Sequence, residues 1–177
     1  ILFENGLDVV LIDSNKEHVE SIKSNGLIIE GFGGNRSVQI PVTTDPSQLE
    51  SANLILFQCK AYSTRDASKS IKHIIRKNSV CISFQNGLGN EEIISEELGV
   101  NKVLGGLTAM AGLLKGPGRI HDFSRVPSYI GEMKGGTSSR VEKIAEKLSK
   151  SGLETHVSEN IKNEIWKKLL GNIALSA

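Results

Sequence analysis

Short apolar runs alternate with amphipathic segments along most of the chain. The runs are typical of strands, and they are VVLI (9–12), LILFQC (54–59), VCISF (80–84) and KVLGG (102–106). Between and after these runs, three segments carry their apolar residues on one stripe, which predicts helices. One of them ends near residue 25, and the other two span about 65–77 and 138–150. Strands that alternate with helices long enough to cross over predict an α/β fold with a doubly wound, mainly parallel sheet.

Turn residues mark further elements. LIIEG (27–31) and SVQIPV (37–42) flank the glycine-rich FGGNR (32–36), which predicts a hairpin. The continuous run VVLI suits a strand buried on both faces. Residues 1–5 are expected to form the last turn of a helix closed by Gly6. Further strands are expected around 109–114 and at 119–123, 128–132 and 153–157. A stripe of Ile161, Ile165, Leu169 and Ile173 predicts a final helix.

Composition argues against several classes of function. The formal net charge is +1 and lysines are scattered among acids, so we expect no nucleic-acid partner and no membrane surface. No segment approaches the roughly 18 consecutive apolar residues of a membrane span. Cys59 and Cys81 lie in apolar runs and suit a reducing cytoplasm.

Because the chain starts at Ile1 without Met and ends inside an amphipathic pattern, we expect a longer natural protein.

The clearest candidate site follows the run VCISF. Asn86 lies two positions beyond it. Gly87, Gly89, Asn90 and two glutamates follow, and the last three are residue types that favour the first turn of a helix. Ligands of open α/β sheets bind at the carboxyl ends of strands, so the side-chain amide of Asn86 is a candidate ligand group. A tight turn before a capped helix is the alternative.

Asp13 follows the first run at the place where dinucleotide-binding units carry an acid for the adenosine ribose. The glycine fingerprint of such units lies roughly 20 residues before that acid, and this chain has only 12 positions before Asp13. Asp13 is therefore a candidate ribose ligand. A helix cap made by Asp13, Ser14 or Asn15 is the alternative.

Two lysines are further candidates. Lys60 directly follows LILFQC and is expected at the same sheet edge as Asn86, where a cation suits phosphate or carboxylate. Lys168 shares a helix face with Asn172, whereas Lys167 points elsewhere, so Lys168 is the one expected to be partly desolvated. Burial would lower its pKa and make it a proton donor near neutrality. For both sites, a solvated lysine is the alternative.

Histidines and the FGGNR glycines carry no predicted chemistry. His18, His73, His121 and His156 are isolated from acids at catalytic or ligand spacing, so we expect structural roles and no metal site. The FGGNR segment lies between strands and does not open a helix, so it lacks the context of a phosphate loop.

Several blocks, in their order and spacing, resemble the ketopantoate reductase family. They are ENGLDVVLID, IKSNGLIIEG, TTDPSQLESANLILFQCKAY, SFQNGLGNEE, VLGGLTAMAG and IWKKLLGNIALSA. The resemblance covers nearly the whole chain. It implies that residues 1–157 form most of a Rossmann-type dinucleotide-binding domain, without its N-terminal glycine motif. Residues 158–177 would then begin a helical substrate domain.

The resemblance also implies an activity. The family reduces 2-dehydropantoate (ketopantoate) to pantoate, a step of pantothenate biosynthesis, with NADPH or NADH. Carried over, its roles make Lys168 the acid that protonates the ketone oxygen, with a small 2-keto acid as partner. The implied substrate-binding residues are Asn86, Asn172 and Ser176, and the implied cofactor-binding residues are Asp13, Ser14, Lys60 and Asn86. A homodimer is compatible with the resemblance.

The chain departs from the family pattern in the missing glycine motif and at two further places. Ser176 stands where the family often has asparagine, and Asp13 and Ser14 occupy a corner where a basic residue commonly meets a 2′-phosphate. An acid repels phosphate, which predicts a preference for NADH, with Lys16 as a compensating cation.

Two other functions stay open on the sequence. The first is a non-catalytic dinucleotide-binding protein that senses redox state, which could dispense with Lys168. The second is a dehydrogenase of similar build that acts on another hydroxy or amino acid. A substrate panel distinguishes them. The chain on its own is expected to be inactive, because further substrate groups belong to the later domain.

Overall fold

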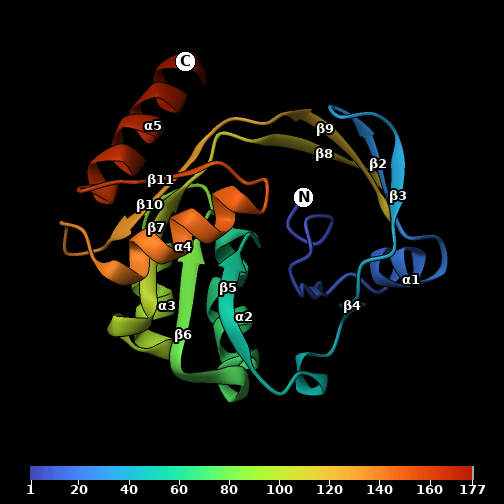
Figure 1. Cartoon of the computed structure of the whole chain (residues 1–177), viewed down its shortest axis with the longest axis horizontal. Coiled ribbons are helices and arrows are strands. Elements are labelled where there is room, and N and C mark those ends of the chain that lie inside the picture. Colours follow the sequence, from blue (N-terminus) through green and yellow to red (C-terminus); the bar gives the residue numbers. More distant parts are fainter. Residues whose placement is uncertain (177) are drawn as a thin grey trace. The chain divides into compact units, whose positions relative to one another are not determined.

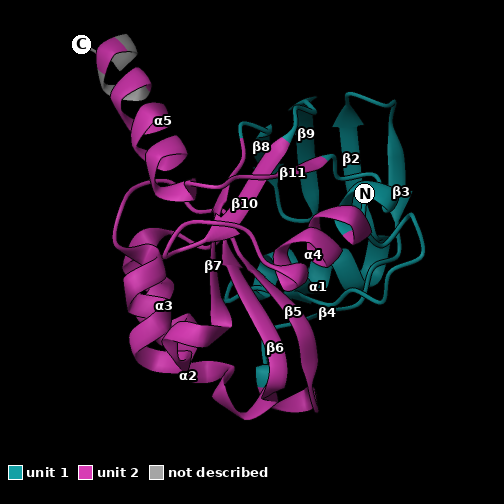
Figure 2. Ribbon diagram, turned by 60° about the vertical axis from the view of Figure 1, so that its left-hand side comes forward, with its two compact units in different colours: residues 1–46, 109–127, 148–154 teal, residues 47–108, 128–147, 155–177 magenta. Residues whose placement is uncertain are grey.

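The computed structural model describes residues 1–176, apart from the side chains of residues 172, 173, 175 and 176. The chain divides into two compact units (Figure 2). Unit 1 comprises Ile1–Pro46, Ala109–Pro127 and Leu148–Glu154, and unit 2 comprises Ser47–Thr108, Ser128–Lys147 and Thr155–Ala177. Within the described residues, no helix has the length and apolar character needed to cross a membrane.

Unit 1 consists of short strands and one capped helix. Its elements are β1 (Leu11–Ile12), α1 (Lys16–Asn25), β2 (Leu27–Gly31), β3 (Arg36–Val38), β4 (Val42–Thr43), β8 (Ala111–Gly116) and β9 (Arg119–Ser124) (Figure 1). One sheet has the order β3-β2-β9-β8, and β1 pairs with β4 in parallel. The hairpin predicted around FGGNR is confirmed, because β2 and β3 pair antiparallel.

Turn chemistry sets the ends of the helical segments in unit 1. Asn15 caps α1 by accepting a hydrogen bond from the His18 amide at 3.1 Å, and Gly26 ends the helix with a φ of +76°. The predicted helical turn before Gly6 is confirmed. Leu7 N–H donates to the Leu2 carbonyl at 3.1 Å and Gly6 N–H donates to the Phe3 carbonyl at 3.0 Å, the bonding pattern of a Schellman motif.

The strand predicted over 9–12 is shorter and more exposed than expected. Only Leu11 and Ile12 are extended in a ladder, and Ile12 is 41% exposed. Leu11 packs against the cluster of Val19 and Ile22 on α1, so one face of the strand is covered. Within the described residues β1 pairs only with β4, which explains why the expectation of burial on both faces was wrong.

Unit 2 contains the larger sheet. Its elements are β5 (Ala52–Phe57), η2 (Ala61–Ser63), α2 (Thr64–Ser70), η3 (Lys72–Ile74), β6 (Ile75–Ser83), α3 (Asn90–Leu98), η4 (Val100–Lys102), β7 (Val103–Leu107), β10 (Ser128–Glu132), β11 (Thr155–Val157) and α5 (Ile161–Ser176). The short helix η1 (Pro46–Gln48) and the helix α4 (Ser139–Lys150) each contain a point where the chain passes between units. The sheet order is β11-β10-β7-β6-β5, and every neighbouring pair is parallel except β7 with β10. The α/β fold with a mainly parallel sheet is therefore confirmed.

Helix α2 is shorter than the predicted 65–77, because tertiary pairing overrides the helical pattern. Ile75 already pairs with Ala52 of β5, and the Ser79 hydroxyl donates to the Ala52 carbonyl at 2.6 Å. Ser79 also accepts the Arg76 amide at 2.8 Å. These bonds draw the polar residues after Ile75 into an irregular start of β6, which begins five positions before the apolar run at Val80.

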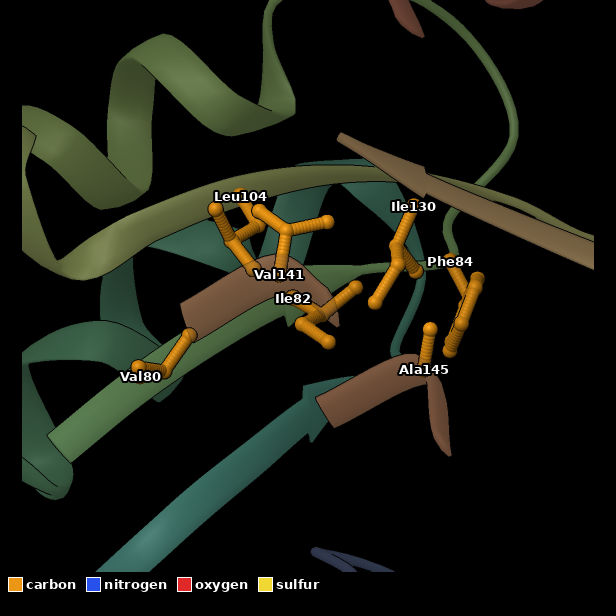
Figure 3. Close-up of a cluster of buried hydrophobic side chains, with 7 residues drawn as sticks. All are labelled: Val80, Ile82, Phe84, Leu104, Ile130, Val141 and Ala145. Atoms are coloured by element: carbon orange, nitrogen blue, oxygen red, sulfur yellow. The ribbon is translucent and has the colours of Figure 1, made fainter. Parts of the chain in front are cut away.

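Successive residues of β6 belong to two different hydrophobic clusters, because side chains along a strand point alternately to opposite faces of the sheet. Figure 3 shows the first, in which Ile82 and Leu104 meet Val141 and Ala145 of α4. Cys81 belongs to the second cluster, together with residues of α3 and of η3. The sheet of unit 2 is thus covered by helices on both faces, and its carboxyl edge is left for polar groups.

Candidate active site

The carboxyl edge of the unit 2 sheet gathers the polar residues that follow its strands. Phe57 of β5 and Ser83 of β6 are register partners, and Lys60 and Asn86 each lie three residues beyond that pair. Thr108 directly follows β7. Since β5, β6 and β7 are parallel, these three residues leave the sheet at the same edge, where open α/β sheets bind ligands.

Two glycines allow helix α5 to approach this sheet closely. Gly105 of β7 and Gly131 of β10 are register partners, and Ile161 at the start of α5 is completely buried against them. A Cβ on Gly131 would lie 2.5 Å from the Ser158 carbonyl oxygen, and a Cβ on Gly105 would lie 2.8 Å from the Ile161 side chain. The close contact fixes the first turn of α5 and hence the position of the residues further along it.

Lys168 of α5 reaches the strand ends with two hydrogen bonds. Its Nζ donates to the Thr108 carbonyl at 2.6 Å and to Asn86 Oδ1 at 3.0 Å. Burial lowers the pKa of this ammonium below the usual lysine range. Two of the three ammonium protons are engaged, so one can be donated to another acceptor.

The neighbouring lysine has a different environment. Lys167 forms an ion pair with Glu164 at 3.1 Å, and its side chain is 62% exposed. The prediction that Lys168, and not Lys167, is the desolvated lysine is therefore confirmed.

A shallow pocket lies beside the Lys168 ammonium. It is lined by residues 85–87 after β6, residues 106–108 at the end of β7, and Ile165, Lys168 and Leu169 of α5. The pocket thus combines apolar walls with an ammonium and a side-chain amide.

Helix α3 begins below the loop that carries Asn86. Gly87 and Gly89 both adopt positive φ, +95° and +87°, and Gly89 stands at the helix cap without a side-chain hydrogen bond. Glu91 in the first turn is 4% exposed, and burial raises the pKa of its carboxyl. The tight turn before a capped helix, the alternative for this segment, is therefore present, and Asn90 in the first turn donates back to the Asn86 carbonyl at 3.2 Å.

Asp13 and Ser14 belong to unit 1, at the carboxyl end of β1. Asp13 Oδ1 accepts the Asn15 amide at 2.8 Å, and both side chains are exposed. The cap of α1 is Asn15, which removes the helix-cap alternative for Asp13 and Ser14. The side chains of Asn172 and Ser176 lie outside the described residues.

Sequence reasoning missed three residues around the site. Thr64 received no role at the site, yet its hydroxyl accepts from Gln85 and donates to Asn90. Gln85 and Thr108 received no role. For Thr108 a signal existed, because it follows the run VLGGL as Asn86 follows VCISF. Nothing in the sequence pairs Thr64 with Asn90, which lie 26 positions apart.

The described histidines have structural contacts where these are resolved. His18 Nδ1 accepts the Gly118 amide at 3.0 Å, and the rings of His121 and His156 pack against Phe123 and Tyr129. The part of the chain that the structure describes contains no group of three or more potential metal ligands.

Comparisons with known proteins show the family of the chain. The model of the family "Ketopantoate reductase PanE/ApbA" matches residues 1–135. The 2-dehydropantoate 2-reductase of Pyrococcus abyssi is 38% identical over 176 residues, which cover 99% of this chain and 57% of that protein. The chain thus spans little more than half the length of this curated relative.

Solved structures are similar over nearly the whole chain. The ternary structure of D-mandelate dehydrogenase with NADH and anilino(oxo)acetate has a TM-score of 0.88 at 30% identity, covering 94% of this chain and 54% of that one. The putative 2-dehydropantoate 2-reductase from Enterococcus faecalis has a TM-score of 0.82 at 28% identity, with the same coverage. The family match and the site geometry lead to one conclusion: this chain belongs to the ketopantoate reductase family.

Proposed function

We propose that the protein containing this chain is an oxidoreductase that reduces 2-dehydropantoate, or a related 2-keto acid, to the 2-hydroxy acid with NADH or NADPH. The observation that carries the proposal is the partly buried Lys168 ammonium, held by Asn86 and Thr108 beside a pocket at the carboxyl edge of the sheet. The names of the relatives support the substrate class, and pantothenate biosynthesis is the setting that we propose for the reaction.

The chemistry assigns one step to Lys168. A reduced nicotinamide held by Lys60 and Asn86 would supply hydride for the carbonyl carbon, so negative charge would develop on the ketone oxygen. Lys168 donates its third proton to that oxygen, which stabilises the charge and forms the hydroxyl group. The amine left behind regains a proton from solvent. The bonds from Lys168 to Asn86 and Thr108 orient the ammonium for this transfer.

Each unit, taken by itself, carries polar groups that suit one part of a dinucleotide. We propose that Asp13 and Ser14, exposed after β1, receive the adenosine ribose, because a carboxylate accepts bonds from a ribose diol. Lys60 and Asn86, at the edge of the unit 2 sheet, would hold the nicotinamide half of the cofactor. On α5, Asn172 and Ser176 follow Lys168 at intervals of four positions, so they share its face and would contact the substrate.

A preference for NADH follows from the charge of Asp13, with Lys16 as a compensating cation. Support comes from D-mandelate dehydrogenase, whose structures hold NADH. The test is Asp13→Asn, which keeps the acceptor for the Asn15 amide. It should reduce the ratio of kcat/KM for NADH over NADPH by about tenfold, since it removes the repulsion of a 2′-phosphate. An unchanged ratio would contradict the assignment.

A second candidate function is the reduction of a bulkier aromatic 2-keto acid. D-mandelate dehydrogenase is 30% identical and was solved with anilino(oxo)acetate, which carries an aromatic ring. A panel of 2-ketopantoate, branched aliphatic 2-keto acids and phenylglyoxylate, assayed with the complete protein, separates the two. The highest kcat/KM for 2-ketopantoate supports the first candidate, and the highest for phenylglyoxylate supports the second.

We also propose the expected organisation and setting. A Rossmann-type domain over residues 1–157, followed by the start of a helical substrate domain at 158–177, agrees with the position of Lys168 on α5. The unpaired Cys59 and Cys81 favour a reducing cytoplasm. A homodimer is to be tested by the mass of the complete protein in solution.

A further inference from the structure

A buried chain of side-chain hydrogen bonds lies beneath the loop that carries Asn86. Gln85 Nε2 donates to the Thr64 hydroxyl and to the Cys59 carbonyl, both at 2.8 Å. The Thr64 hydroxyl donates in turn to Asn90 Oδ1 at 3.1 Å. Asn90 Nδ2 then donates to the Asn86 carbonyl oxygen at 3.2 Å. The bonds thus run in one direction from Gln85 to the backbone of Asn86.

Thr64 links the side-chain amides of Gln85 and Asn90, and its hydroxyl both accepts and donates a hydrogen bond. A hydroxyl has a single proton, and Thr64 uses it toward Asn90 while accepting from Gln85. Thr64 and Asn90 are 0% and 1% exposed, so bulk water does not reach either bond. Removal of the hydroxyl would leave the buried Oδ1 of Asn90 without its donor, which disfavours this arrangement of the Asn90 side chain.

The Asn86 loop needs such an anchor. The side chain of Asn86 is exposed, and the residues that follow include Gly87 and Gly89, both with positive φ. Glycine has access to more of the backbone map than other residues, so the loop has many alternative conformations. The Asn90 bond to the Asn86 carbonyl selects the conformation in which Asn86 Oδ1 meets the Lys168 ammonium at 3.0 Å.

We propose that Thr64 is a positioning residue for the reaction: through Asn90 it fixes the backbone of Asn86, and thereby the orientation of the Lys168 ammonium. This inference rests on the proposed function, because Lys168 is the proposed acid. Thr64 itself lies at the first position of α2, outside the residues that line the pocket.

The test is a double-mutant cycle in the complete protein. Thr64→Val removes the hydroxyl at nearly constant volume, and it should lower kcat/KM by about tenfold, mostly through kcat. Thr64→Ser restores the hydroxyl and should stay within about twofold of wild type. In an Asn86→Ala background, Thr64→Val should cost less than about twofold, because residues that act through one another are not additive. Ser70→Ala removes an exposed hydroxyl from the same helix and serves as the matched control.

Two results would overturn the proposal. An equal loss on Thr64→Val in both backgrounds would mean a general structural role, and a Thr64→Ser variant as slow as Thr64→Val would exclude the hydroxyl as the cause. If Thr64→Val does not fold, Asn90→Asp takes its place in the cycle. That variant keeps an oxygen that accepts from Thr64, and it replaces the donor to the Asn86 carbonyl by a carboxyl oxygen that repels this carbonyl.

Hydrogen exchange separates this proposal from the proposed function. If the wild-type protein reduces no 2-keto acid, the function fails while the positioning claim remains testable. Thr64→Val should then speed the exchange of the amides at residues 86–89 by about tenfold, whereas Thr64→Ser should not. Unchanged exchange in Thr64→Val would contradict the positioning claim whatever the activity.

Discussion

Lys168 illustrates how two adjacent, chemically identical side chains acquire different properties. The ammonium of Lys168 is partly buried and bonded to Asn86 and Thr108, while that of Lys167 is exposed and paired with Glu164. The difference comes from the 100° that separates consecutive residues on a helix. Sequence spacing was sufficient to predict it, because the apolar stripe of α5 showed which face is covered.

Replacement of these two lysines should have unequal effects. Lys168→Ala removes the proposed proton donor and should lower kcat by about 10²–10⁴-fold. Lys167→Ala removes an exposed ion pair and should change kcat by less than about twofold. Steady-state kinetics on both variants of the complete protein checks the contrast, and equal losses would sink the assignment of Lys168.

The pH dependence of the reaction should reflect the lowered pKa of Lys168. Reduction needs the protonated ammonium, so kcat/KM for the keto acid should fall as pH rises through that pKa. Oxidation of the hydroxy acid needs the neutral amine and should show the opposite slope. Lys168→Arg keeps a cation that stays protonated, so the alkaline fall should disappear from its residual activity. A fall at the same pH in Lys168→Arg would assign the titration to another group.

At the scale of elements, glycines place α5. Gly131 and Gly105 become register partners through the antiparallel pairing of β10 with β7. These two strands are not joined by a short turn, because residues 109–127 between them belong to unit 1. No local pattern in the sequence gives that pairing. Individual elements were easier to predict: β10 and the hairpin of β2 and β3 followed from apolar runs and turn residues. The early start of β6 was not predicted, because it depends on a bond from Ser79 to β5.

Gly131→Ala should disturb the site through α5. Its Cβ would lie 2.5 Å from the Ser158 carbonyl oxygen, so the segment that leads into α5 must shift. We expect the free energy of unfolding to fall by about 1–3 kcal/mol, and kcat to fall with it. Denaturant unfolding and steady-state kinetics measure the two effects.

The matched control is Gly112→Ala in β8. The nearest atom to its Cβ would be the His121 carbonyl oxygen at 3.5 Å, an ordinary contact. If Gly112→Ala and Gly131→Ala are equally stable and equally active, close packing at Gly131 does not position α5.

At the scale of the whole molecule, buried polar groups decide how stability varies with pH. Glu91 is almost completely buried, and burial raises the pKa of its carboxyl above the ordinary glutamate value. The folded state therefore binds this proton more tightly than the unfolded state. The resulting stability is fully present below the ordinary pKa and is lost as pH rises through the raised one.

Glu91→Gln should remove this loss. The stability of the variant relative to wild type should increase from pH 4 to pH 8, because the amide does not ionise. Urea unfolding at several pH values measures the difference. Glu92→Gln, on the exposed side of the same helical turn, is the control. A difference between Glu91→Gln and wild type that stays constant with pH would contradict the account.

The fold class was predictable because alternating strands and helices leave a strong sequence pattern, and the strand-end position of Asn86 followed from it. The buried link from Thr64 to Asn90 was not predictable, since it depends on how α2 and α3 meet in three dimensions. The exposure of β1 was missed for the same reason, because strand burial depends on neighbours that the local sequence does not contain.

The most direct measurement of the central claim is the oxidation of NADH by the complete protein in the presence of 2-ketopantoate, followed by absorbance at neutral pH. The account predicts turnover with stoichiometric formation of the 2-hydroxy acid, and its near loss in Lys168→Ala. If neither NADH nor NADPH is oxidised with any 2-keto acid of the panel, or if Lys168→Ala turns over as fast as wild type, the proposed function is wrong.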